Sequence, residues 1–386
     1  MLKIAVITGT RADYGLLFWL LKGLQEDNSF HLELVATGTH FSEEHGNTYK
    51  FIESDGFKIT KKIQILHGKD GSIDTALSTA EAIKGFSNYF DESDIDIVII
   101  LGDRYEALAA ASSAMFARIP VLHIHGGEVT SGAYDDMIRH SITKMSQFHS
   151  TSSHEHMQRV IQLGENPENV KNFGAPGLEH LKRSKLLSKK DLSEALNFDL
   201  KKFFLFTYHS ETLSTTPVED QISEILKALD SFVGYNILFT FPNADDGGKK
   251  IIESINNYVK RFPNRCLAMP SLGQEKYFSA LSCCDLVLGN SSSGIIEAPA
   301  AGVPSINIGD RQLNRSSAKS VINCRNSMHD ILNSIELGLS EDFRNEKDIY
   351  ANPYGEGKTS EKIISWLKKI KYKDKKIFYD LIQEVD

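Results

Sequence analysis

The pattern that constrains the fold most is an apolar run followed by a helical stretch and a second apolar run. Ile95–Leu101 is almost unbroken in its apolar character, which is typical of a central strand in a parallel sheet covered on both faces. Gly102–Asp103 follows, then a helical stretch to Ala117 and a short run at Pro120–Ile124. This order of elements predicts a βαβ unit and therefore a parallel sheet with helices packed on it.

The same alternation continues along the chain in two halves of similar size. We therefore predict an α/β protein with two doubly wound, Rossmann-type sheets facing a cleft. The other predicted strands are Lys3–Ile7, His31–Ala36, Phe148–Ser150, Phe203–Thr207, Asn236–Phe241, Arg265–Ala268, Leu286–Leu288 and Val303–Ile308, and the helical stretches include Asp13–Leu24, Asp135–Ser146, Val218–Leu229 and Gly248–Arg261.

The charged stretch Ser184–Phe198 lacks β character, and we place the boundary between the domains in or just before it. This gives an N-terminal domain over 1–180 and a C-terminal domain over 181–365. Six lysines occur between Lys368 and Lys376, and we interpret this run as a solvated helix face.

Composition excludes several classes of protein. The 386 residues carry 43 basic and 51 acidic side chains, a net charge of −8 that disfavours nucleic acid as a partner. The four cysteines form no C-x-x-C pair, which argues against a zinc framework or a secreted disulfide scaffold. The longest apolar run is far shorter than the ~20 residues of a membrane-spanning helix. We expect a cytoplasmic protein with no membrane partner.

Two turns in the first half carry groups suited to an anionic ligand. Thr8–Arg11 reads TGTR after the first strand, where a glycine turn and a helix start attract anions and Arg11 offers a planar fork. Asp103 and Arg104 follow the Ile95–Leu101 strand. The alternative interpretations are a plain turn for the first and a helix cap for Asp103.

Titratable residues gather after the Pro120–Ile124 strand. His123 and His125 are two residues apart and would share a face if both lay on the strand. Glu128 follows a Gly-Gly pair, and Asp135 begins the next helical stretch. Such density favours acid–base chemistry. A metal site with the two histidines and nearby aspartates is the alternative, although we predict no metal.

The second half ends its strands in polar groups. Leu288–Glu297 reads LGNSSSGIIE, in which hydroxyls and backbone N–H groups at a helix start can cradle phosphate. Glu297 lies about one turn further and is suited to a ribose diol, whereas a serine-rich cap is the alternative interpretation. His209 and Asn243 follow two other strands, and Arg311 follows a third.

Together these stretches resemble hydrolysing UDP-N-acetylglucosamine 2-epimerases, the branch that begins sialic-acid and related nonulosonic-acid synthesis. The resemblance runs over nearly the whole chain, and the segment DDMIRH points to the hydrolysing branch. The stretches that carry it are GTRADYG (Gly9–Gly15), TGTH (Thr37–His40), GNTY (Gly46–Tyr49), LGDRYE (Leu101–Glu106), HIHGGEVTSGAYDDMIRHSITKMS (His123–Ser146), FPNAD (Phe241–Asp245), GNSSSGIIE (Gly289–Glu297) and INIGDRQ (Ile306–Gln312).

The resemblance implies a GT-B-like fold in which a last helix, about 366–386, joins the first domain. It also implies UDP binding mainly by the second domain, no cofactor, and a homodimer or homotetramer. Asp103 and Asp135 match catalytic carboxylates of the family. The positions that match substrate contacts are Arg11, Asp13, His40, Arg104, His209, Asn243, Ser291, Ser292, Glu297 and Arg311.

Two positions depart from the family pattern. Many members have a catalytic glutamate where this chain has His125, so either His125 takes that role or Glu128 reaches in from three residues on. The triplet His209–Glu211 reads His-Ser-Glu, where relatives often carry His-Pro-Glu or His-Arg-Arg.

The implied reaction converts UDP-N-acetylglucosamine and water to N-acetylmannosamine and UDP. It proceeds by elimination to a 2-acetamidoglucal and hydration of that intermediate. The alternatives are the same reaction on a UDP-linked 2,4-diacetamido-trideoxy sugar or on GDP-N-acetylglucosamine, a non-hydrolysing epimerase, a GT-B glycosyltransferase, a metal-dependent phosphoesterase and a non-catalytic nucleotide-sugar sensor.

Overall fold

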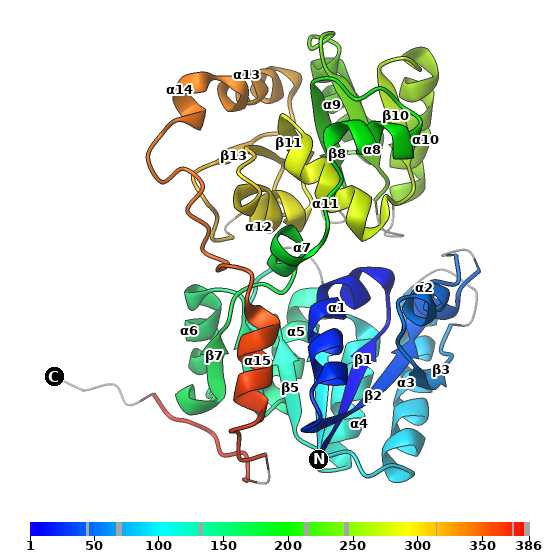
Figure 1. The fold of residues 1–386 in the computed structure, drawn as a ribbon, viewed down its shortest axis with the longest axis vertical. Helices are drawn as coiled ribbons and strands as arrows, with labels where there is room; N and C mark the ends of the chain where they lie inside the picture. Colours follow the sequence, from blue (N-terminus) through cyan, green and yellow to red (C-terminus); the bar gives the residue numbers. More distant parts are fainter. Residues whose placement is uncertain are drawn as a thin grey trace, which may run out of the picture. The chain divides into compact units, whose positions relative to one another are not determined.

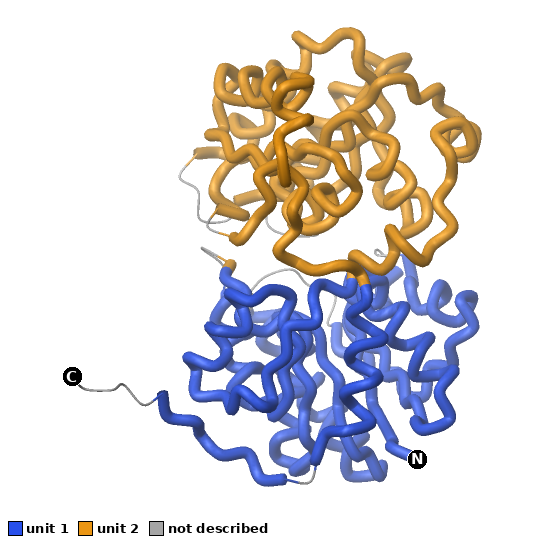
Figure 2. Tube along the Cα trace, turned by 60° about the vertical axis from the view of Figure 1, so that its left-hand side comes forward, with its two compact units in different colours: residues 1–129, 134–176, 358–386 blue, residues 130–133, 177–357 orange. Residues whose placement is uncertain are grey.

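The chain forms two compact units (Figure 2). The computed structural model describes residues 1–43, 46–66, 72–130, 134–211, 216–242, 247–313, 315–372 and 374–381. Unit 1 comprises 1–129, 134–176 and 358–386, and unit 2 comprises 130–133 and 177–357. The sequence-based boundary at 180 lies close to the point where the chain leaves unit 1, and the chain returns to unit 1 at Lys358.

Unit 1 is built on a seven-stranded parallel sheet in the order β3-β2-β1-β4-β5-β6-β7. The chain begins at β1 in the interior of the sheet, winds through β2 to the edge at β3, and then crosses to β4 and winds to the other edge (Figure 1). Its strands are β1 (Leu2–Thr8), β2 (Phe30–Thr37), β3 (Ile59–Ile63), β4 (Ile97–Leu101), β5 (Val121–Ile124), β6 (Phe148–Thr151) and β7 (Val170–Asn172).

Helices cover both faces of this sheet because successive strand residues point to opposite sides. In β1, Ile4 and Val6 join the apolar cluster under α1 and α15, whereas Ala5 and Ile7 join the cluster under α3 and α4. The helices of unit 1 are α1 (Arg11–Glu26), α2 (Tyr49–Ser54), α3 (Ser72–Asp91), α4 (Tyr105–Phe116), α5 (Asp135–Met145), α6 (His154–Gln162) and α15 (Thr359–Leu367), with short 3-10 turns at Gly38–Phe41 and Pro167–Asn169.

Unit 2 repeats the plan with a six-stranded parallel sheet in the order β10-β9-β8-β11-β12-β13. Its strands are β8 (Phe203–Thr207), β9 (Asn236–Thr240), β10 (Cys266–Met269), β11 (Leu286–Gly289), β12 (Ser305–Ile308) and β13 (Val321–Cys324). Its helices are α7 (Leu178–Arg183), α8 (Lys189–Leu196), α9 (Val218–Leu229), α10 (Gly248–Arg261), α11 (Gly273–Cys283), α12 (Ser292–Ala300), α13 (Met328–Leu339) and α14 (Glu341–Arg344). The predicted doubly wound sheets are thus confirmed.

The C-terminal segment departs from the prediction of a helix over about 366–386. The helix is α15, and it packs so closely on α1 that a Cβ at Gly23 would lie 2.3 Å from Ile364 (Figure 1). The described residues after it contain no further helix. The lysine run is not a solvated helix face either, because the Lys376 ammonium pairs at 2.5 Å with the buried carboxylate of Glu165. No helix among the described residues is both long enough and apolar enough to cross a membrane.

Candidate active site

The predicted site residues follow the carboxyl ends of the parallel strands, where open α/β sheets bind their ligands. In unit 1 they follow β1, β2, β4 and β5, and β1 and β4 are the neighbouring strands at which the winding of the sheet reverses. In unit 2 those within the described residues follow β8, β11 and β12, of which β8 and β11 are the corresponding pair. Each unit therefore has its own set of polar residues at the carboxyl ends of its strands, which we call its polar rim.

Asp103 is held by a buried arginine. The Arg139 guanidinium donates one hydrogen bond to the Asp103 carboxylate and another, at 2.9 Å, to the backbone carbonyl oxygen of Glu128. The helix that follows Asp103 has Arg104 at its N-cap position, and no side chain caps it. Asp103 therefore does not serve as the helix cap that was its alternative interpretation, and it remains partly exposed with a charged partner.

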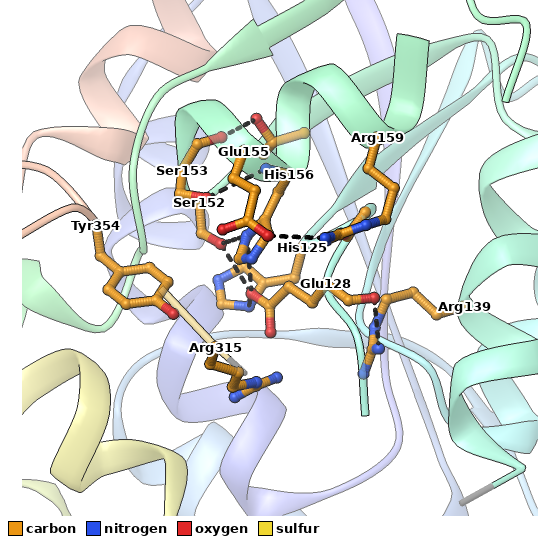
Figure 3. Close-up of polar contacts among 12 residues, drawn as sticks. His125, Glu128, Arg139, Ser152, Ser153, Glu155, His156, Arg159, Arg315 and Tyr354 are labelled. Carbon is orange, nitrogen blue, oxygen red and sulfur yellow. Dashed lines mark hydrogen bonds and ion pairs between the residues drawn. The ribbon is translucent and has the colours of Figure 1, made fainter. Parts of the chain in front are cut away.

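His125 and Glu128 lie in direct contact (Figure 3). Nδ1 of His125 is 3.1 Å from Oε1 of Glu128, and both side chains are largely buried, with 12% and 5% exposed. The same carboxylate oxygen accepts a hydrogen bond from Oγ of Ser152 at 2.8 Å, and Oγ of Ser152 lies 2.9 Å from Nδ1 of His156. We call these four residues the His125 network.

The loop that carries this network has a constrained backbone. His125 has a φ of +67°, a left-handed conformation that is unusual for a residue with a Cβ and is often found at functional sites. Gly127 also has a positive φ, and a Cβ there would lie 2.3 Å from the carbonyl oxygen of His156. Arg159 donates to the Gly127 carbonyl at 2.5 Å. The loop therefore has little freedom to reorient.

His123 does not share a face with His125 as the sequence suggested, because β5 ends at Ile124 and the chain turns at His125. The two ring nitrogens of His123 lie 2.8 Å from the Gly102 carbonyl oxygen and 3.1 Å from Oγ1 of Thr143. Burial lowers the pKa of His123 to about 3. A ring with both nitrogens engaged is a structural group rather than a metal ligand.

The two aspartates at the start of α5 have different surroundings. Asp135 is the first residue of the helix. Asp136 lies 3.6 Å from the Arg139 guanidinium and 3.5 Å from Nε2 of His140. Among the described residues, no group of three or more His, Cys, Asp or Glu side chains is arranged to hold a metal ion.

The other predicted binding residues of unit 1 include two that make structural contacts. Asp13 accepts hydrogen bonds from the backbone N–H groups of Gly9 and Thr10, at 2.8 and 2.7 Å, and so shapes the turn at the start of α1. The ring of His40 is buried, and its nitrogens lie 3.0 Å from Oγ1 of Thr8 and 2.8 Å from Oγ1 of Thr48. Burial lowers the pKa of His40.

Two cations remain at this rim of unit 1. The Arg11 guanidinium lies 4.2 Å from the centre of the Phe51 ring, and burial lowers its pKa. Nε of Arg104 lies 2.8 Å from Oε1 of the buried Glu106, whose charge raises the pKa of Arg104. Both are placed after parallel strands, as an anion-binding rim requires.

In unit 2 a buried asparagine organises the rim. The Asn290 side chain accepts from the His209 backbone N–H at 2.7 Å and donates to the His209 carbonyl oxygen at 2.9 Å. The Asn290 carbonyl oxygen accepts from Arg311 at 3.0 Å. Burial lowers the pKa of His209 to about 3, helped by the charge of Arg311. The side chain and the backbone carbonyl of Asn290 thus join three strand ends.

Glu211, one of the departures from the family pattern, has a clear contact. Its Oε1 accepts from the backbone N–H groups of Asp310 and Arg311, at 2.8 and 3.3 Å. The third residue of the triplet therefore fixes the loop that presents Arg311. Asn243, another predicted contact, lies outside the described residues.

The serine-rich segment begins α12 as predicted. Ser291 is the N-cap residue, and its side chain accepts a hydrogen bond from the backbone N–H of Ser293. Ser292 is the first residue of the helix, and Glu297, 7% exposed, lies further along it. The helix start offers N–H groups of the kind that bind phosphate.

Comparisons with known proteins agree with this geometry. Residues 22–368 match the family described as UDP-N-acetylglucosamine 2-epimerase. A Campylobacter jejuni protein named GDP/UDP-N,N'-diacetylbacillosamine 2-epimerase (hydrolyzing) is 40% identical over 89% of this chain and 88% of its own length. This chain belongs to the UDP-N-acetylglucosamine 2-epimerase family.

Other relatives of this 2-epimerase family extend the likeness. The Escherichia coli polysialic acid biosynthesis protein P7 is 38% identical over 99% of this chain and 98% of its own length. The Neisseria meningitidis UDP-GlcNAc 2-epimerase, solved with UDP-GlcNAc bound, has a TM-score of 0.81 at 18% identity, over 96% of this chain and 100% of that one. The predicted GT-B-like fold class and the assignment to the hydrolysing branch, an enzyme acting on nucleotide sugars, are confirmed.

Sequence reasoning did not select several residues that organise the two rims. Ser152 and His156 in unit 1 and Asn290 in unit 2 contact predicted site residues but had no role predicted from the sequence, and Arg139 was noted only as one of the titratable residues that gather after β5. Arg139 carried a usable signal, because it lies in the DDMIRH segment near the two aspartates. Ser152 and His156 carried no such signal, because they lie just after β6 and in α6, away from the predicted site residues in the sequence.

Proposed function

We propose that this enzyme converts UDP-N-acetylglucosamine and water to N-acetylmannosamine and UDP, at the start of sialic-acid or related nonulosonic-acid synthesis. The observation that supports this most is the contact of Asp103 with Arg139, which also holds the loop bearing His125 and Glu128. A partly exposed carboxylate held beside further titratable groups is suited to proton transfer. The likeness to named 2-epimerases gives the reaction class.

The proposed chemistry has two steps. In the first, a base takes the proton from C2 of the sugar, the C–H electrons form the C1=C2 double bond, and the C1–O pair leaves with UDP. In the second, water adds its oxygen to C1 and an acid returns a proton to C2 from the opposite face. Asp103, Asp135 and either His125 or Glu128 perform the proton transfers in unit 1.

Unit 2 holds the nucleotide in this proposal. The start of α12 at Ser291 and Ser292 and the Arg311 guanidinium bind the diphosphate, and Glu297 binds the ribose hydroxyls. His209 and Asn243 complete the nucleotide contacts, and Arg11 and Arg104 of unit 1 add positive charge. No cofactor enters the reaction.

A second candidate substrate is UDP-N,N'-diacetylbacillosamine, because the Campylobacter jejuni relative is named for this sugar. The two substrates differ at C4 and C6, away from the bonds that react. The deciding experiment incubates the pure protein with each substrate in D₂O and identifies the released sugar by NMR. We expect UDP and a free 2-epimerised sugar with deuterium at C2 from one of them. Retention of UDP on the product, or loss of turnover with a chelator, would overturn the proposal.

We also propose a homodimer or homotetramer in the cytoplasm. The end of α4 carries Met115 and Phe116, 43% and 79% exposed, on an apolar surface suited to a second copy. The four cysteines are all free, as a reducing compartment favours. Light scattering of the purified protein measures the assembly, and a monomer at micromolar concentration would contradict it.

A further inference from the structure

The two nitrogens of the His125 ring have different surroundings. Nδ1 faces Oε1 of Glu128 at 3.1 Å. Nε2 is buried, and among the described residues it has no hydrogen-bond partner. In a ring with one engaged nitrogen and one unengaged nitrogen, the uncommitted bonding position is at the second.

The hydrogen-bond directions in the His125 network follow from the chemistry of its members. An ionised carboxylate only accepts, so the Ser152 hydroxyl donates its single proton to Glu128. Oγ of Ser152 must then accept from Nδ1–H of His156, which lies 2.9 Å away. Nδ1 of His125 faces the same Glu128 oxygen at 3.1 Å, and a carboxylate favours a proton on the ring nitrogen that faces it. In the neutral ring the lone pair is therefore on Nε2 of His125.

Building on the proposed function, we propose that His125 is the third proton-transfer residue and that Glu128, Ser152 and His156 are positioning residues for it. Nε2 of His125 takes the C2 proton of the sugar as the C1–O bond breaks toward UDP. The carboxylate of Glu128 stabilises the imidazolium that forms. This resolves the alternative between His125 and Glu128 in favour of the histidine.

The rigidity of the surroundings supports this division of roles. Arg139 holds the backbone carbonyl of Glu128, and the carboxylate cannot move away without breaking its hydrogen bond from Ser152. Ser152 and His156 are buried as well, with 0% and 2% exposed. A carboxylate enclosed in this way is suited to orienting a neighbour rather than to leaving its place.

The test is a double-mutant cycle measured by kcat and KM. His125→Asn keeps a donor near Glu128 but lacks Nε2, and we expect it to lower kcat by about 10²–10⁴-fold. Ser152→Ala lowers kcat about tenfold with KM within about twofold, and Ser152→Thr restores it to within about threefold. In the His125→Asn background, Ser152→Ala has no further effect, because a positioning residue acts only through the group it positions.

The matched control is Ser150→Ala. Ser150 lies on β6, which ends one residue before Ser152; it is fully buried, and its hydroxyl has no hydrogen-bond partner among the described residues. We expect kcat within about twofold of wild type. A fall equal to that of Ser152→Ala would show a general effect on the strand and would overturn the positioning role.

A readout independent of turnover separates this proposal from the proposed function. Nitrogen NMR of histidine-labelled protein should show His125 protonated at Nδ1 and bare at Nε2, with its signals identified by their loss in His125→Asn. Ser152→Ala should mix the two tautomers. An active wild type whose His125→Asn variant keeps kcat, or additive losses in the double mutant, would overturn the inference alone. A wild type that shows the expected tautomer but releases no sugar would overturn the proposed function.

Discussion

The two units build their polar rims in different ways. In unit 1 the site residues contact one another through side chains, as in the pairs Asp103–Arg139 and His125–Glu128. In unit 2 the loops after the corresponding strands are fixed by side chains that bind the backbone: Asn290 and Glu211 accept hydrogen bonds from main-chain N–H groups of neighbouring loops. The first arrangement sets up proton transfer, and the second presents fixed donors to a bound anion. Substitutions in unit 1 should therefore act on kcat, and those in unit 2 on KM.

The largest effect should follow removal of charge at the unit 1 acids. Asp103→Asn and Asp135→Asn should each lower kcat by about 10²–10⁴-fold with little change in KM, because proton transfer needs the ionisable group. The measurement is the initial rate of UDP release. Asp96→Asn is the control, because Asp96 precedes β4 and binds the Lys3 backbone N–H at the other end of the sheet. A variant that loses stability while its kcat stays normal would show that the aspartate has only a structural role.

A smaller loss of kcat should follow a change of the arginine that joins the two groups. Arg139→Lys keeps the charge but cannot bind the Asp103 carboxylate and the Glu128 carbonyl oxygen together, so kcat should fall by about 10–100-fold. The melting temperature should fall as well, since the arginine is 3% exposed. Arg183→Lys, in an i,i+4 pair with Glu179, is the control. Equal kinetics in Arg139→Lys and wild type would remove Arg139 from the site.

Unit 2 should respond in binding instead. Glu297→Gln should raise KM for the nucleotide sugar, and the inhibition constant of UDP, about tenfold with kcat nearly unchanged, because the ribose contact is equal in the ground and transition states. The matched control is Glu275→Gln in the first turn of α11, where the side chain is exposed. A loss confined to kcat would place Glu297 in the chemistry and would break the division between the units.

The smallest effect concerns acid stability. Burial lowers the pKa of His40, His123, His140 and His149 in unit 1, and of His209 in unit 2. Each of these rings binds a proton less readily when folded than when unfolded, so the free energy of unfolding falls as the pH drops below 6.5, and for His123 and His209 this loss continues toward pH 3.

With more of these groups in its described part, unit 1 should unfold at a higher pH than unit 2. The two tryptophans, Trp19 and Trp366, both lie in unit 1, so their fluorescence reports that unit and far-UV circular dichroism reports both. As the pH is lowered, we expect the tryptophan fluorescence to change at a higher pH than the pH at which the remaining helical circular dichroism signal is lost. Coincident transitions would show that the units unfold together.

Much of the fold was predictable because each strand and helix carries a local signal. The limits of β8, α9 and α10 agree with the sequence-based ranges to the residue, since buried apolar runs and amphipathic periods mark them directly. The last helix was placed at about 366–386 from the family resemblance, whereas α15 covers Thr359–Leu367 and the described residues after it form no helix. The actual structure of this C-terminal segment depends on a tertiary contact with Glu165.

The sequence by itself determined the repeating βα plan, the strand ends at which polar residues gather, and the family to which they point. Only the tertiary structure decided which of those residues meet. His123 and His125 are close neighbours in sequence, yet one is a bonded core group and the other begins a left-handed turn. Asp103 is bound by Arg139 of α5, and Glu128 by Ser152 from beyond β6, because the ends of neighbouring parallel strands bring segments that are distant in the sequence together.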